Sequence, residues 1–169
     1  GDGPLYFFNL FERSSAMDEF ENGYKTALRF ISKRMKTEAE VRKRLNTRCP
    51  DQVTDQVIER LKDDGYLDDA LYVDCYIRDR MKFNPMGRHR IKMELEQKGI
   101  KKELIENSSE YLAIDEKKVI EGLLETKLKG CDVKDEKQKR RLLGYLVRRG
   151  FSFEAINRVL AQHFGRSRS

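Results

Sequence analysis

The sequence has little of what stabilises secreted domains or anchors a chain in a membrane. Its three cysteines, Cys49, Cys75 and Cys131, are odd in number, far apart and without CxxC spacing, so we expect neither a disulfide framework nor a zinc site. No apolar run approaches the roughly 20 residues that span a bilayer. The first residues also lack the basic-then-apolar order of a signal peptide. These absences predict a protein of the reducing cytoplasm that does not enter a membrane.

Residues that carry catalysis are also scarce. The two histidines are His89, which stands between two arginines that would repel a metal ion, and His163, which has no second ligand at helical spacing. The pairs Asp63-Asp64 and Asp68-Asp69 lack the alternating ligands and closing glutamate of a calcium loop, so turns and helix caps explain them better. No GxxxxGK(S/T) loop or GxGxxG segment is present. We therefore expect no enzyme activity, no catalytic residue, no metal and no cofactor.

Charge is abundant instead. The chain of 169 residues is 38% charged and 38% hydrophobic, which is enough apolar material for a folded core with a polar surface. Its formal net charge is +6 and its pI is near 9.2. An excess of this sign favours an acidic partner, such as nucleic acid, an acidic protein face or an anionic membrane.

A repeat runs through the whole chain. Leu45, Leu95 and Leu146 stand 50 and 51 residues apart, and each closes a basic, apolar-periodic segment. A second apolar pair follows each of them: Val57-Ile58, Leu104-Ile105 and Ala155-Ile156. A period near fifty residues indicates one small helical unit used three times, with function distributed along an array.

Local signals give the limits of the helices. Thr37 followed by Glu40 predicts a capping box at a helix start. Gly65, Gly99 and Gly150 follow apolar-periodic segments, where glycine tolerates the left-handed conformation that ends a helix. The first repeat departs from this pattern, because Cys49-Pro50 stands where the other two have glycine. No useful apolar-polar alternation appears after residue 17. We predict an all-α protein of about nine helices, in three tandem three-helix repeats that form an elongated array open to curvature.

The predicted organisation has five parts. We assign an N-terminal leader to residues 1–17, the three-helix repeats to 18–66, 67–113 and 114–164, and a basic tail to 165–169. The leader is aromatic-rich with no polar face, and it could be a short strand, a segment that docks on a partner, or a remnant of cloning. It is given no function.

The charge repeats with the helices. Residues 33–48 carry seven Lys/Arg against two acids, 80–92 carry five with no acid, and 137–149 carry six with no acid. Residues 51–74 and 103–121 are acidic. If the units stack, the basic segments could align into one positive strip; otherwise each is a solvated helix face.

The basic segments supply the candidate contact residues, whose side chains suit phosphates or carboxylates without reading sequence. They are Arg34, Lys36, Arg42, Lys43, Arg88, Arg90, Lys92, Lys139, Arg140, Arg141, Arg148 and Arg149.

In their order, four stretches of this sequence resemble the RecX family of bacterial recombination regulators. They are Arg34-Met35-Lys36-Thr37-Glu38-Ala39-Glu40-Val41-Arg42, then Asp64-Gly65-Tyr66-Leu67-Asp68-Asp69 with Tyr72, then Pro85-Met86-Gly87-Arg88 leading to Ile91, Leu95 and Lys98-Gly99-Ile100, and Arg148-Arg149-Gly150-Phe151-Ser152 with Ile156. The resemblance covers residues from about 25 to 162. Residues 1–17 lie outside it.

The resemblance implies three tandem three-helix repeats that act on the recombinase RecA. Members of this family bind RecA and its nucleoprotein filament and generally suppress its ATPase, strand-exchange and coprotease activities, without being enzymes. On this sequence the resemblance gives Gly65, Gly99 and Gly150 the role of ending helices, and Tyr66 and Leu67 that of packing between repeats. We expect a monomer. The alternative is an architectural protein that binds single- or double-stranded DNA independently of sequence.

Overall fold

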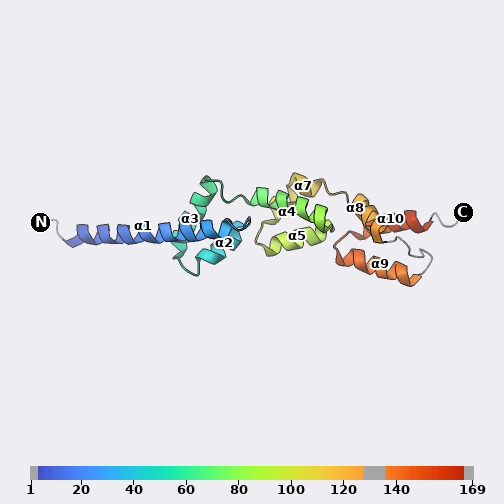
Figure 1. Ribbon diagram of the computed structural model, residues 1–169, viewed down its shortest axis with the longest axis horizontal. Coiled ribbons are helices and arrows are strands. Elements are labelled where there is room, and N and C mark those ends of the chain that lie inside the picture. The colour runs from blue at the N-terminus through green and yellow to red at the C-terminus, as the bar shows by residue number, and fades with distance from the viewer. Residues whose placement is uncertain (1–3, 128–135, 166–169) are drawn as a thin grey trace. The chain divides into compact units, whose positions relative to one another are not determined.

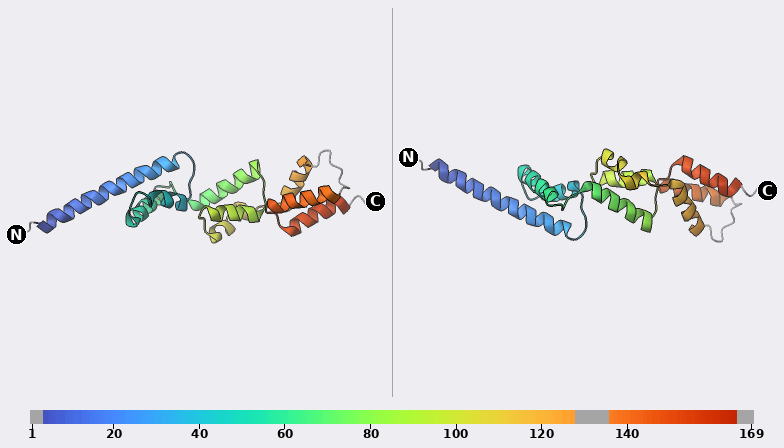
Figure 2. Two further views of the ribbon diagram at one scale, coloured as in Figure 1. Left: turned by 90° about the horizontal axis from the view of Figure 1, so that it is seen from below. Right: turned by 90° about the horizontal axis from the view of Figure 1, so that it is seen from above.

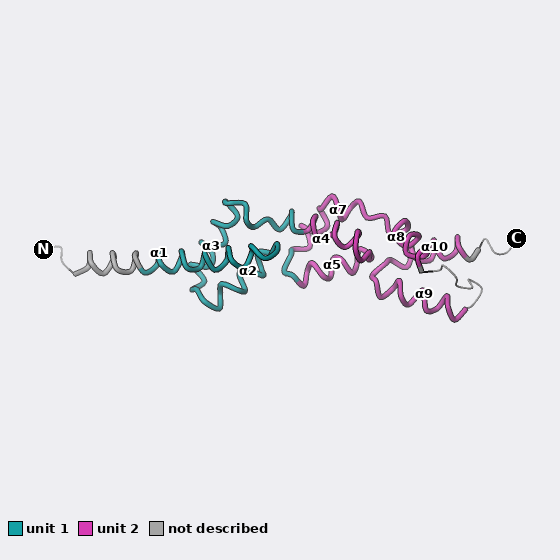
Figure 3. Tube along the Cα trace, viewed as in Figure 1, with its two compact units in different colours: residues 1–72, 98–100 teal, residues 73–97, 101–169 magenta. Residues whose placement is uncertain are grey.

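All regular secondary structure in the described part of the chain is helical. The computed structural model describes residues 4–127 and 136–165, and within them it has ten α-helices and no strand (Figure 1). The predicted all-α class is confirmed. Cys49 and Cys75 are free thiols, while Cys131 and the end of the basic tail lie outside the described residues. The chain divides into two compact units: residues 1–72 with 98–100, and residues 73–97 with 101–169 (Figure 3).

The first unit is built from three helices around an aliphatic core. They are α1 (Pro4–Ile31), α2 (Glu38–Leu45) and α3 (Asp51–Asp63), and α1 contacts both of the others. Val41, Leu45, Val57 and Ile58 are fully buried in their shared core. The predicted capping box at the start of α2 is confirmed. The Glu40 amide donates to Thr37 Oγ1 at 3.2 Å, and the Thr37 amide donates to Glu40 Oε2 at 3.0 Å.

The N-terminal segment is part of α1. The possibility of a short strand in the leader is wrong for residues 4–17, because the helix begins at Pro4 and continues without a break to Ile31. Proline suits the first turn of a helix, where its missing N–H has no partner to lose. The helix could not be predicted from sequence, because an aromatic-rich stretch with no polar face shows no 3.6-residue period of apolar side chains. The predicted boundary after residue 17 therefore falls inside α1.

One polar side chain in the core of the first unit has no partner. Thr54, on α3, is fully buried, and its hydroxyl makes no hydrogen bond. An unsatisfied buried hydroxyl costs about 1–3 kcal/mol. We expect Thr54→Val, which keeps the shape and removes the hydroxyl, to raise the free energy of unfolding by about 1 kcal/mol in urea titrations. Thr54→Ala is the control. It leaves a void, so a gain as large as that of Thr54→Val would contradict this account.

The second unit contains most of the remaining helices. They are α4 (Asp69–Phe83), of which the first residues belong to the first unit, α5 (Arg88–Gln97), α6 (Lys102–Glu106), α7 (Ser109–Leu112), α8 (Glu116–Lys127), α9 (Glu136–Arg148) and α10 (Phe153–Gly165). Helix α10 lies beside α8 and α9 (Figure 2). Ile120, Leu124, Leu146 and Ile156 form the centre of their core.

The expected count of about nine helices is one too low for the described residues. Leu104 and Ile105 lie on α6 and Leu112 lies on α7, so this part of the second repeat contains two short helices and not one. Ser108 starts the second of them, since its hydroxyl oxygen accepts a hydrogen bond from the Tyr111 amide at 3.2 Å. The same hydroxyl donates to Asp74 Oδ1 at 2.6 Å. This cap, supported from α4, interrupts the helix.

The turn after α3 corrects one expected packing residue. Gly65 has a φ of +75°, and the Tyr66 and Leu67 amides both donate to the Leu61 carbonyl. Leu67 is buried in the core of the first unit, but Tyr66 is 52% exposed. Neighbouring side chains diverge in this turn, so only one of the two can enter the core. The expectation that Tyr66 packs is therefore wrong.

Candidate functional site

The structure separates the twelve basic candidates into two groups. Seven have internal partners: Lys36, Arg42, Arg88, Arg90, Lys92, Lys139 and Arg149. Five have exposed side chains without a hydrogen-bond, ion-pair or ring partner in the described part of the chain: Arg34, Lys43, Arg140, Arg141 and Arg148.

In the first unit, Arg42 is neutralised by carboxylates and Lys36 is buried against an aromatic ring. Arg42 pairs with Asp55 and, at 3.3 Å, with Glu38 one turn earlier on α2. Lys36 is only 8% exposed, and its ammonium lies 4.3 Å from the centroid of the Phe30 ring. These two side chains stabilise the fold of the first unit, and little of their charge is available to a partner.

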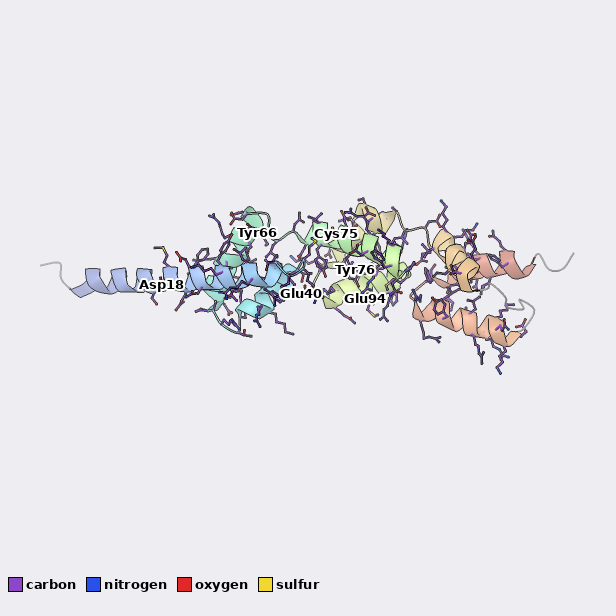
Figure 4. The ribbon with its side chains drawn as sticks, viewed as in Figure 1. Asp18, Glu40, Tyr66, Cys75, Tyr76 and Glu94 are labelled. Atoms are coloured by element: carbon purple, nitrogen blue, oxygen red, sulfur yellow. The ribbon has the colours of Figure 1, made fainter. Side chains whose placement is uncertain are left out.

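On α5 the basic side chains form a network with acids. Arg90 pairs with Glu94 at 2.8 Å, Lys92 pairs with Glu106 at 2.6 Å, and Tyr76 on α4 donates to Glu94 (Figure 4). Burial, followed by the hydrogen bond to Glu94, raises the pKa of Tyr76 to about 12. Burial alone would raise the pKa of Glu94, but the bonds from Tyr76 and Arg90 outweigh it and lower this pKa. Glu94 therefore stays ionised and holds the nearby cations.

Arg88 and Arg149 complete the backbone hydrogen bonding of the second unit. Arg88 Nη2 donates to the Leu112 carbonyl at 3.1 Å and to the Ile114 carbonyl at 2.7 Å. Arg149 Nη1 donates to the Pro85 carbonyl at 2.5 Å. Main-chain carbonyls at the ends of helices need such donors, because no later turn supplies one. Both arginines therefore have a structural role inside the unit.

A junction built in the same way occurs in each unit. In the first, Thr37 Oγ1 donates to the Lys98 carbonyl at 2.8 Å, and Asp69 accepts from the Glu38 amide at 2.9 Å. In the second, the Gly87 amide donates to the Arg149 carbonyl at 2.8 Å, and Glu116 accepts from the Arg88 amide at 2.8 Å. In each junction, a carboxylate accepts a hydrogen bond from the first turn of one helix. The residue just before that helix donates to the carbonyl of the residue just after a second helix.

Sequence reasoning missed the contacts of these junctions and did not name Glu116. Asp69 and Glu116 stand 47 residues apart, and Lys98 and Arg149 stand 51 apart, so the fifty-residue period was the signal that could have found them. Glu116 is the most heavily used, because it also accepts from the Ser152 amide at 3.1 Å and from its hydroxyl at 2.6 Å. Ser152 caps α10, since its hydroxyl oxygen accepts from the Ala155 amide at 3.3 Å.

Helix α9 carries the largest group of unpartnered cations. Arg140, Arg141 and Arg148 are exposed, while Leu142 and Leu146 on its other side are buried. A side-chain carbon at Gly144 would lie 3.2 Å from Arg148 Nη1, so the Arg148 guanidinium lies over the glycine. The charge of α9 therefore faces solvent over two turns of helix.

The described part of the chain shows neither a cluster of metal ligands nor a helix fit to span a membrane. The described residues contain no group of three or more His, Cys, Asp or Glu that could hold a metal ion, and none of the helices in the same ranges has the length and apolar character to cross a membrane. His89 and His163 are exposed. Asp64 accepts hydrogen bonds from Tyr24 and Arg60, and Asp68 caps α4 by accepting from the Leu71 amide. The paired acids therefore serve the fold.

Comparisons with known proteins agree on one family. The models of the first, second and third three-helix domains of RecX match residues 24–61, 68–108 and 115–160, in that order. The chain is 34% identical over 148 residues to a regulatory protein RecX of Geobacillus kaustophilus, covering 85% of this chain and 55% of the relative. It is 34% identical over 145 residues to one of Clostridium acetobutylicum, covering 82% of this chain and 67% of that protein. The chain thus spans little more than half the length of the first of these relatives.

Solved structures show the same fold. A crystal structure of RecX from Lactobacillus salivarius aligns with a TM-score of 0.77 over 86% of this chain and 97% of that one, at 24% identity. A second crystal structure, of a regulatory protein RecX, aligns with a TM-score of 0.76 over 88% of this chain and 76% of that one, at 19% identity. With all three domains matched in sequence and the fold shared, the chain belongs to the RecX family.

Proposed function

We propose that the chain is a non-enzymatic regulator of recombination and DNA repair in the bacterial cytoplasm, which binds RecA and its nucleoprotein filament and inhibits RecA activities. The observation that carries this proposal is the match of all three RecX domains in chain order. The relatives bear the name of regulatory proteins.

Two physical features support the proposal. The described residues offer no cluster of metal-ligating side chains, and the two histidines stand apart on the surface, so a binding role accounts for the chain better than catalysis does. The net charge of +6 would speed encounter with an acidic filament, and this contribution to binding would weaken as salt rises. Specificity for RecA would come from shape and apolar contacts.

The test is the ATPase activity of RecA on single-stranded DNA, with this protein titrated in. We expect the rate to fall and to saturate as the protein binds the filament. A rate unchanged at saturating protein would overturn the proposal.

The second candidate is an architectural DNA-binding protein, and the three unpartnered arginines of α9 favour it. A gel-shift titration with and without RecA separates the two functions. Tight binding to bare DNA together with an unaffected RecA ATPase would favour the architectural protein.

A further inference from the structure

The three helices that carry the marker leucines differ on their outer surfaces. Leu45 on α2, Leu95 on α5 and Leu146 on α9 are all fully buried, so these helices hold equivalent places in their repeats. On α2 and α5, Arg42, Arg90 and Lys92 pair with carboxylates of the same or a neighbouring helix, and Lys43 is the one cation of these two helices without a partner in the described residues. On α9 the only acid is Glu136, its first residue.

The outer side of α9 brings three guanidinium groups together. Arg140 and Arg141 precede Gly144 by one turn, and Arg148 follows it by one turn, so all three border the position that has no side chain. Arg141 and Arg148 are seven residues apart, which is about 10 Å along the helix. Arg148 lies over Gly144, and the helical spacing places Arg140 and Arg141 on the same side of α9.

Such a surface is electrostatically unfavourable by itself. Like charges one turn apart on a helix repel each other, and here none of the three arginines forms an ion pair with a carboxylate of the described residues. A partner with a regular series of negative charges would remove this repulsion. Arginine also donates two parallel hydrogen bonds to phosphate oxygens.

We infer that α9 is a contact surface for the phosphodiester backbone of nucleic acid, and that α2 and α5 do not share this role. The inference deepens the proposed function. It rests on that function only in taking the nucleic acid to be the DNA of a RecA filament. In place of a positive strip that runs over all three repeats, it assigns the contact to a single helix of the third repeat. Contacts to phosphate of this kind would be independent of base sequence.

An acidic protein face fits α9 less well. The centres of protein interfaces are rich in aromatic residues and methionine, whereas surfaces that bind nucleic acid are polar and strongly positive. Among the large apolar side chains of the second unit, Phe83, Leu112 and Phe153 are the most exposed, and all three lie on other helices. The one exposed large apolar side chain of α9 is that of Val147, which is 38% exposed.

The test measures binding of the full chain to a fluorescent single-stranded oligonucleotide over a range of salt concentrations. The variant is Arg140→Gln, Arg141→Gln and Arg148→Gln together, because glutamine keeps helix propensity. The matched control is Arg34→Gln, Lys43→Gln and Arg48→Gln, which removes the same charge from exposed, unpartnered side chains of the first unit. Circular dichroism checks that both variants remain folded.

We expect the α9 variant to bind at least about tenfold more weakly near physiological salt, and the slope of log K against log salt to become shallower by about 2, which corresponds to three lost phosphate contacts on a single strand. The control should change affinity less than about twofold. An equal loss in both variants would overturn the inference, because the net charge and not α9 would then set the affinity. Failure of the wild-type chain to bind the oligonucleotide would overturn it as well.

Binding of the wild type and of the α9 variant to DNA-free RecA is measured as well, because an acidic face of RecA is the other possible partner of α9. If the α9 variant binds the oligonucleotide like the wild type but loses binding to DNA-free RecA, then α9 contacts an acidic protein face and the inference is wrong. RecA ATPase inhibition by the wild-type chain, measured in parallel, reports on the proposed function separately. Its absence would overturn that function and leave the binding by α9 standing.

Discussion

Gly150→Ala should lower the free energy of unfolding by about 4 kcal/mol, a large part of the stability of a typical domain. Gly150 has a φ of +78°, which costs an alanine about 1–2 kcal/mol. A β-carbon there would also lie 2.4 Å from Arg90 Cβ and 2.5 Å from the Arg90 amide nitrogen. Because one of these neighbours is backbone of α5, the clash cannot be relieved by a side-chain rotation. Urea denaturation followed by circular dichroism measures the loss.

Gly65→Ala is the matched control for this prediction. Gly65 also has a positive φ, +75°, but nothing lies within 4 Å of the position of its β-carbon. Its replacement should therefore cost only about 1 kcal/mol, the contribution of the backbone conformation. Equal losses at the two positions would show that the approach of Gly150 to α5 contributes nothing to stability.

The second large effect is expected at Arg88. Arg88→Ala removes two charge-assisted hydrogen bonds to the carbonyls of Leu112 and Ile114, worth about 3 kcal/mol together. It also removes the packing of the aliphatic stem. In a chain of this size we expect the midpoint of thermal unfolding to fall by roughly 10 °C, measured by differential scanning calorimetry. Arg88→Lys should recover little of this, since an ammonium group does not reproduce the fork of a guanidinium.

Arg148→Ala provides the comparison for Arg88. Both arginines are candidate contact residues by sequence, but Arg148 is exposed and has no partner in the described ranges. Its loss should change stability by less than about 0.5 kcal/mol. If Arg88→Ala left the unfolding midpoint as unchanged as Arg148→Ala does, Arg88 would not have the structural role assigned to it.

The repeat, the helical class and the main helix ends could be predicted because each depends on local chemistry. The capping box at Thr37 and Glu40 needs only two residues three apart. The long N-terminal helix could not be predicted, since its aromatic-rich first part has no helical period. The split between α6 and α7 depends on Asp74, which supports Ser108 from a distant part of the sequence.

The candidate surface was predictable only as a list of charges. Sequence alone gives Arg42, Arg88 and Arg148 equal weight, since all three lie in basic segments. Their difference comes from carboxylates and carbonyls that are distant in the sequence, such as Asp55 beside Arg42 and Ile114 beside Arg88. Charge density therefore marks the helices, and tertiary contacts decide which cations remain available.

The division into units has a consequence for any attempt to dissect the protein. The first unit is not one stretch of chain, because Lys98, Gly99 and Ile100 belong to it while the residues on either side of them do not. A fragment ending at Tyr72 would lose the Lys98 carbonyl that accepts from Thr37, together with the contact between Gly99 and Ala39. No single cut of the polypeptide releases this unit intact, so the roles of the two units are better separated by point substitutions than by truncation.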